Sequence, residues 1–150
     1  MDERLRAAIF RAVEEEPFAG LMGIKLTELS DGASTVTMRH EPKRMDNLFA
    51  RAHGGAVFAL MDEAFETACQ THGTVAVALN VSVTYVASPE PGAYLTCTAR
   101  ETSLTKRTAS YEIRVSDEEG RVLALCQALA FRTGKPLPFL AAEGGGKECE

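Results

Sequence analysis

The feature that most constrains the fold is one long apolar helix in a chain whose other long segments alternate like strands. Residues 54–72 follow the 3.6-residue period of an α-helix, and Gly73 is the expected C-terminal stop. A shorter amphipathic helix is expected over residues 2–15, ending before Pro17. A mostly apolar helix needs cover on more than one side. The sequence therefore predicts an α+β fold in which an antiparallel sheet curls around one central helix.

Alternation of apolar and polar residues predicts the strands of this sheet. Residues 24–30 and 33–39 flank Asp31 and Gly32, a strong hairpin signal, and residues 40–52 are expected to form an irregular loop. After the helix we expect four more strands, at residues 74–88, 93–103, 107–116 and 121–132. We expect a single domain over residues 1–150, with residues 1–17 as a helical lead and residues 135–150 as a flexible tail.

Composition excludes several classes of function. The net charge is −5, and no basic run is longer than a pair such as Lys106 and Arg107, which argues against nucleic acid as a partner. No apolar run approaches the length of a membrane span, and the N-terminus lacks the apolar core of a secretory signal. The four cysteines show no CxxC pairing, which favours reduced thiols and a cytoplasmic location.

The start of the long helix carries residues suited to acyl transfer or hydrolysis. His53 is followed by Gly54 and Gly55, and glycines at a helix start let a substrate approach N–H groups that no helical carbonyl has claimed. The helix dipole favours negative charge at the same place. Asp62, two helical turns later, offers a possible base or nucleophile.

Asp62 is expected at the border between the two faces of the helix. The apolar arc of the helical wheel contains Phe58, Leu60, Met61, Ala64, Phe65, Ala68 and Cys69. The polar arc contains Asp62, Glu63, Glu66, Thr67 and Gln70. Partial burial and repulsion from Glu66 should raise the pKa of Asp62, which suits a base near neutral pH. The alternative is that Asp62 is simply the first polar residue of a surface stripe.

Several segments together resemble the hotdog-fold acyl-CoA thioesterases of the phenylacetyl-CoA thioesterase (PaaI-like) branch. The segments are AHGGAVFALMDEAF at residues 52–65, Asn47 fifteen positions before Asp62, and residues 83–99, 105–115 and 123–134. The resemblance spans about residues 20–134, most of the chain. It implies a hotdog fold, in which an antiparallel sheet curls around one long central helix.

The resemblance also implies roles for particular residues. Asp62 matches the catalytic carboxylate, acting as nucleophile or as general base toward water. Gly54 matches the residue whose N–H polarises the thioester carbonyl, and Gly55 permits close approach. His53 and Asn47 match residues that line the site, where Asn47 would help to place the water.

A second set of residues is expected to bind substrate. Phe49 would contact the acyl group, while Lys106 and Arg107 would hold coenzyme A phosphates or be ordinary exposed charges at a strand turn. Glu66 and Asn80 complete this set. Another alternative concerns Phe18, Leu21 and Met22, which are expected in the core but could instead wall the acyl pocket.

Two departures from the family pattern leave the activation of water open. Glu66 stands where many relatives have a small or hydroxyl residue, and Ala78 stands where some carry a serine that helps to hold water. Asp62 could therefore activate water directly or attack the thioester to form an anhydride.

The expected activity is hydrolysis of an aryl-acetyl or medium-chain acyl-CoA to free acid and CoA, without a metal or redox cofactor. The resemblance implies a homodimer whose site takes its loop and helix from different subunits, and which pairs again into a homotetramer. No metal site is expected, because the sequence has neither an HxxxH pattern nor a Cys/His pair. The alternatives are a non-catalytic acyl-CoA-binding hotdog module and a hotdog hydratase or dehydratase with an Asp-His pair.

Overall fold

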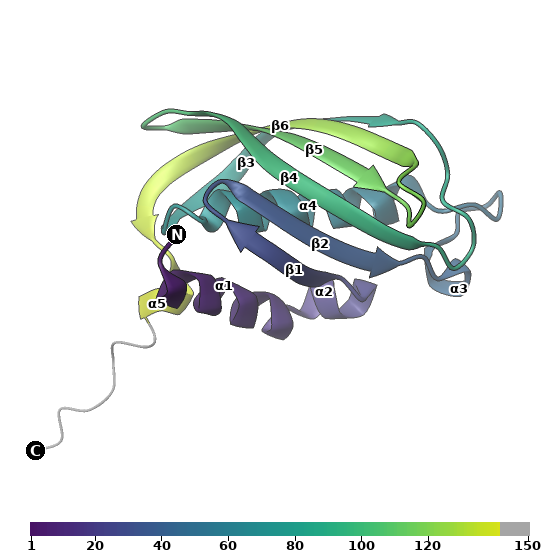
Figure 1. The fold of residues 1–150 in the computed structure, drawn as a ribbon, viewed down its shortest axis with the longest axis horizontal. Coiled ribbons are helices and arrows are strands. Elements are labelled where there is room, and N and C mark those ends of the chain that lie inside the picture. The colour runs from purple at the N-terminus through teal and green to yellow at the C-terminus, as the bar shows by residue number, and fades with distance from the viewer. Residues whose placement is uncertain (142–150) are drawn as a thin grey trace, which may run out of the picture.

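The computed structural model describes residues 1–141 and contains one six-stranded sheet with five helices in that range (Figure 1). The helices are α1 (Glu3–Glu15), α2 (Pro17–Met22), α3 (Pro42–Met45), α4 (Gly54–Gln70) and α5 (Pro138–Ala141). The strands are β1 (Lys25–Ser30), β2 (Ala33–Arg39), β3 (Thr74–Tyr85), β4 (Tyr94–Leu104), β5 (Thr108–Ser116) and β6 (Val122–Pro136).

The sheet is fully antiparallel and has the strand order β1-β2-β4-β5-β6-β3. It curves around α4, as Figure 1 shows, while α1 and α2 lie beside β1. The predicted hairpin is confirmed, since β1 and β2 meet at Asp31 and Gly32, and Gly32 has a φ of 66°. The predicted α+β hotdog arrangement is therefore correct.

The core lies between α4 and the inner face of the sheet. Leu60, Met61 and Ala64 of α4 are completely buried, and the rings of Phe65 and Tyr111 meet edge to face with centroids 5.3 Å apart. The sheet contributes buried residues from every central strand, among them Val36, Cys97, Val115 and Ala124. The apolar arc expected from the helical wheel is buried as predicted, apart from the half-buried Phe58.

The expected polar arc of α4 is partly wrong, because Glu63, Thr67 and Gln70 are buried. The hydroxyl groups of Thr67 and Ser34 lie 2.7 Å apart and share a hydrogen bond. The Gln70 side-chain amide both donates to and accepts from the backbone of Ala76, at 3.1 and 3.2 Å. The sheet thus satisfies two of these polar groups, which lets it cover a wider part of the helix than the wheel predicts.

Both ends of the chain also differ from expectation. Asp2 caps the predicted first helix by accepting from the Arg4 N–H at 2.8 Å, but a second helix, α2, begins at Pro17, because proline is well tolerated at the first helical position. The tail expected from residue 135 is wrong for residues 135–141, which belong largely to β6 and α5 and include the buried Leu137. The remaining tail, residues 142–150, lies outside the described residues.

One edge of the sheet is long and apolar. Within residues 1–141, β3 pairs with a strand on its β6 side alone, and the half-exposed Val77 and Leu79 lie along it. A twelve-residue edge strand of this kind presents unpaired N–H and C=O groups to any further strand. The edge at β1 is half as long, with six residues.

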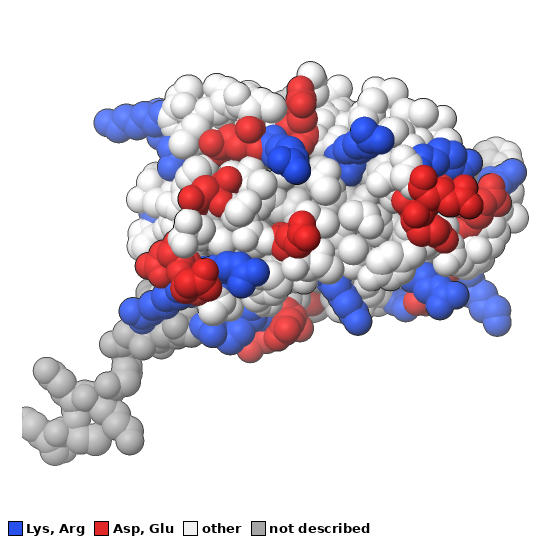
Figure 2. Space-filling model, viewed as in Figure 1, with Lys and Arg blue, Asp and Glu red and all other residues white. Residues whose placement is uncertain are grey.

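The charged surface is mixed on the face that Figure 2 shows, where acidic and basic side chains are interspersed without an extended basic field. Within residues 1–141, every helix is too short or too polar to cross a membrane.

Leu60 tests the central position of α4. Because Leu60 is completely buried, the Leu60→Ala variant should lose about 2–5 kcal/mol of unfolding free energy through lost contacts and the cavity left behind. Urea denaturation measures this loss. Leu104→Ala, at a half-exposed position, serves as the control and should lose less than about 1 kcal/mol, and an equal loss in both variants would contradict the assigned packing.

Candidate active site

The N-terminus of α4 presents one free backbone donor. His53 is the N-cap, and its Nδ1 accepts a hydrogen bond from the Gly55 N–H at 2.9 Å. The Ala56 N–H donates to the His53 carbonyl, also at 2.9 Å. Among residues 1–141 the Gly54 N–H has no acceptor, so it remains available for a substrate oxygen.

Both glycines at this helix start are closely approached by side chains. A Cβ at Gly54 would lie 3.1 Å from Cζ of Tyr85, whose hydroxyl donates to the Gly54 carbonyl at 2.9 Å. A Cβ at Gly55 would lie 3.0 Å from Nδ1 of His53. Tyr85 was not identified from the sequence. The sequence feature that could have identified Tyr85 is its position on the same face of β3 as Val83, which packs against the core.

The loop that precedes the helix is folded around Asn47. Its Oδ1 accepts from the N–H groups of Phe49 and Arg51, at 2.8 and 3.3 Å. The side-chain oxygen of Asn47 therefore holds its own loop. Leu48 and Phe49, at the tip, are 87% and 75% exposed, so in the single chain the Phe49 ring lies mostly in solvent.

Buried hydrogen bonds anchor this loop at its base. His40, which is itself buried, has Nε2 at 2.8 Å from Asp46 and Nδ1 at 3.1 Å from the Glu90 carbonyl. The His53 N–H donates to the Met45 carbonyl at 2.7 Å. The His40–Asp46 pair thus connects the loop to the segment between β3 and β4, with His40 buried and Asp46 at the border of a surface hollow.

Asp62 lies on the exposed stripe of α4 together with Glu66. Partial burial of the Asp62 carboxyl group raises its pKa, as the sequence predicted. Burial also raises the pKa of Glu66, with further contributions from the negative charges of Glu16 and Asp62. Among the described residues Asp62 has no ion-pair partner, which leaves its carboxylate free to act as a base.

Asp62 and the free Gly54 N–H are separated along the same helix. Eight residues of α-helix rise about 12 Å, so the two groups cannot contact one carbonyl group within a single chain. A site that uses both must therefore combine Gly54 of one chain with Asp62 of another.

Two hollows flank the helix start. One, of about 370 Å³, lies toward β3 and is lined by Gly54, Val57, Tyr85 and the chain that follows Tyr85. The other, of about 300 Å³, lies toward α2 and α3. Its lining includes Phe18, Met22, Met45, His53 and Gly55.

The expectation that Phe18 and Leu21 belong to the core is wrong. They are 51% and 61% exposed, because α2 packs on α4 through Ala19 and leaves these two side chains outward. Phe18 and Met22 line the smaller hollow, which agrees with the alternative that they wall a pocket.

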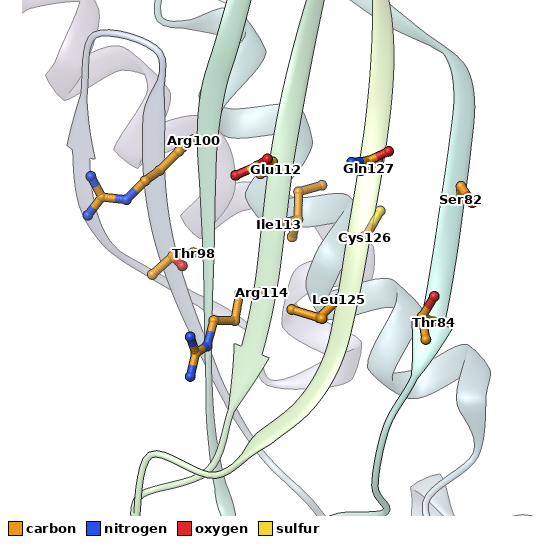
Figure 3. A pocket seen from close by; sticks show the side chains of 10 residues that line it. All are labelled: Ser82, Thr84, Thr98, Arg100, Glu112, Ile113, Arg114, Leu125, Cys126 and Gln127. Atoms are coloured by element: carbon orange, nitrogen blue, oxygen red, sulfur yellow. The ribbon is translucent and has the colours of Figure 1, made fainter.

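The remaining predicted residues lie elsewhere in the single chain. A hollow of about 540 Å³ opens on the outer face of the sheet, lined by β3, β4, β5 and β6 (Figure 3), and contains no residue of the predicted site. Asn80 lines a neighbouring hollow of about 350 Å³ on the same face. Lys106 and Arg107 occupy the β4–β5 turn, at the opposite end of the sheet from α3 (Figure 1).

Comparison with known proteins identifies the class. The family model of the thioesterase superfamily matches residues 49–124. The acyl-coenzyme A thioesterase PaaI of Escherichia coli is 31% identical over 121 residues, which are 81% of this chain and 86% of the relative. The structure of E. coli PaaI from the phenylacetic acid degradation operon has a TM-score of 0.84 at 28% identity and covers 89% of this chain and 96% of that one.

Two further solved structures are similar. A variant of the phenylacetic acid degradation protein PaaI from Thermus thermophilus is 36% identical, with a TM-score of 0.74, over 78% of this chain and 99% of that one. A Streptococcus mutans protein bound to acetyl CoA is 25% identical, with a TM-score of 0.71, over 76% and 91% of the two chains.

The fold and these relatives define a hotdog-fold thioester hydrolase. The chain belongs to the thioesterase superfamily, in its PaaI-like branch.

His53 tests the cap at the start of α4. His53→Ala removes the acceptor for the Gly55 N–H and should lower the unfolding free energy by about 1 kcal/mol, while His53→Asn supplies a side-chain oxygen and should restore most of it. Thermal unfolding gives the stability of both variants, and thioesterase assays give their rates. If His53 serves only as a cap, His53→Asn also keeps its activity; an inactive but stable His53→Asn would contradict that role.

Proposed function

We propose that the protein hydrolyses an acyl-CoA thioester to a free acid and CoA, at a site formed by two copies of the chain. The observation that carries the proposal is the free Gly54 N–H at the start of a buried seventeen-residue helix. A donor fixed in this way is preorganised for the negative charge that develops on a thioester oxygen. One such hydrogen bond can be worth about 3 kcal/mol in the transition state.

Asp62 of the second copy supplies the base or the nucleophile. Its raised pKa brings the carboxylate closer to the pH at which a general base is most effective. As general base it removes a proton from water as the water attacks the carbonyl carbon. As nucleophile it forms an anhydride that water then cleaves. Both routes release the same acid and the CoA thiol.

The second copy docks along β3. The apolar edge of this strand can pair with its symmetry mate in a two-fold arrangement, which also places the two α4 helices side by side. The same arrangement buries Leu48 and Phe49, two large apolar side chains that are otherwise mostly exposed to water at the loop tip. It can also bring Phe49 to the acyl group of the neighbouring site. We further propose that such dimers pair into a tetramer.

The acyl group lies in the hollow beside α2. Phe18, Met22 and Met45 give this hollow an apolar part that suits an aryl-acetyl or a medium-chain acyl group, while Arg44 and Asp46 make the rest of its lining polar. The acyl-coenzyme A thioesterase activity and the acetyl CoA ligand of the relatives support a CoA ester as substrate. Lys106 and Arg107 would bind CoA phosphates only at a site completed by another chain.

Asp62→Asn tests the catalytic carboxylate. The amide cannot remove a proton from water, so kcat should fall by a factor of about 10³, while folding and CoA-ester binding persist. A thiol-trapping assay with aryl-acetyl and medium-chain CoA esters measures the rate. Glu14→Gln removes an equal charge from an exposed position of α1 and serves as the control. Turnover by Asp62→Asn at the wild-type rate would remove Asp62 from the mechanism.

Paired variants of Gly54 test the donor itself. Gly54→Ala adds a Cβ that Tyr85 must accommodate but keeps the N–H, whereas Gly54→Pro adds the same Cβ and removes the N–H at a position where helices accept proline. The proline variant should be about 10²-fold slower than the alanine variant.

Mixing then tests whether two chains share the site. Gly54→Pro and Asp62→Asn chains, unfolded together and refolded, should regain about a quarter of the wild-type activity, because half of the two-fold dimers are mixed and each has one intact site of two. A mixture no more active than its parents would show that each site lies within one chain.

A further inference from the structure

Three carboxylates from distant parts of the sequence meet beside α4. Glu16 joins α1 to α2, while Glu63 and Glu66 lie one turn apart on α4. Carboxylate oxygens of all three lie within 4.8 Å of one another. Within residues 1–141, none of the three forms an ion pair with a lysine, arginine or histidine.

Glu63 is the unusual member of this cluster. Its side chain is only 4% exposed, and its Oε1 has no hydrogen-bond partner among the described residues. Burial without a partner strongly disfavours a charged carboxylate, and the nearby charges of Glu16, Glu66 and Asp62 add repulsion. Glu63 therefore differs from the other buried polar groups of α4, Thr67 and Gln70, whose hydrogen bonds are complete.

We propose that Glu16, Glu63 and Glu66 together bind one hard divalent cation. Carboxylate oxygens without nitrogen or sulfur ligands are the donor set that Ca²⁺, Mn²⁺ and Mg²⁺ use. Oxygens bound to the same Ca²⁺ can lie up to about 5 Å apart, and those bound to the same Mg²⁺ up to about 4 Å. Mg²⁺ dehydrates reluctantly and demands near-ideal octahedral geometry, so three protein carboxylates suit Ca²⁺ or Mn²⁺ better, with water completing the coordination.

The cation gives the cluster a structural purpose. The cation neutralises the negative charge of three carboxylates that the fold holds close together. It also connects the α1–α2 junction to the central helix. Without a cation, three neighbouring carboxylates, one of them buried, face one another with no positively charged partner among the described residues. Histidine and cysteine patterns in the sequence cannot predict such a site, because all of its ligands are carboxylates.

Cation titration of the full chain tests the proposal. Chelator-treated protein is titrated with Ca²⁺, Mn²⁺ or Mg²⁺, with melting temperature as one readout and the electron paramagnetic resonance signal of free Mn²⁺ as another. We expect one saturable site per chain, a melting temperature that rises by several degrees at saturation, and tighter binding of Ca²⁺ or Mn²⁺ than of Mg²⁺.

Variants identify the ligands in the same titration. Glu63→Gln keeps the shape of the side chain and should weaken Mn²⁺ binding at least about tenfold, and Glu16→Gln, at a more accessible position, should do the same. Glu14→Gln, which removes an equal charge outside the cluster, should change binding by less than about twofold. The proposal is overturned if none of the cations binds saturably at millimolar concentration, or if Glu63→Gln and Glu16→Gln bind Mn²⁺ as tightly as the wild type.

Discussion

The burial of α4 within the curved sheet is the constraint on which the other features depend. Because the sheet holds the helix on several sides, the first N–H groups of α4 have a fixed direction. The same rigid helix also fixes the distance between Gly54 and Asp62 at about 12 Å. One chain thus holds the donor and the acid apart, and a shared site requires two such helices side by side.

Local patterns in the sequence predict much of the fold. Alternating residues locate all six strands, and the Asp31-Gly32 turn fixes the first hairpin. The period and glycine boundaries of residues 54–72 locate α4 to within two residues at its C-terminal end. The glycine pair identifies the free N–H, since a helix start always leaves donors unpaired. These features depend on residues close together in the sequence.

Features that depend on distant contacts could not be predicted in this way. A helical wheel assigns Glu63 to solvent, because it cannot include the neighbouring chain at the α1–α2 junction, where Glu16 lies close to Glu63. It likewise misses that Thr67 and Gln70 are satisfied by Ser34 and Ala76, which the wheel does not contain. The separation of Asn80, Lys106 and Arg107 from the helix start follows from sheet topology, which strand patterns alone do not determine.

The contact between Tyr85 and Gly54 connects the edge strand of the sheet to the start of the central helix. Tyr85 is the last residue of β3, the strand along which a second copy is proposed to dock, and its hydroxyl holds the carbonyl of the residue that carries the free donor. In the proposed dimer, a displacement of this strand would therefore also move the peptide that carries the proposed donor.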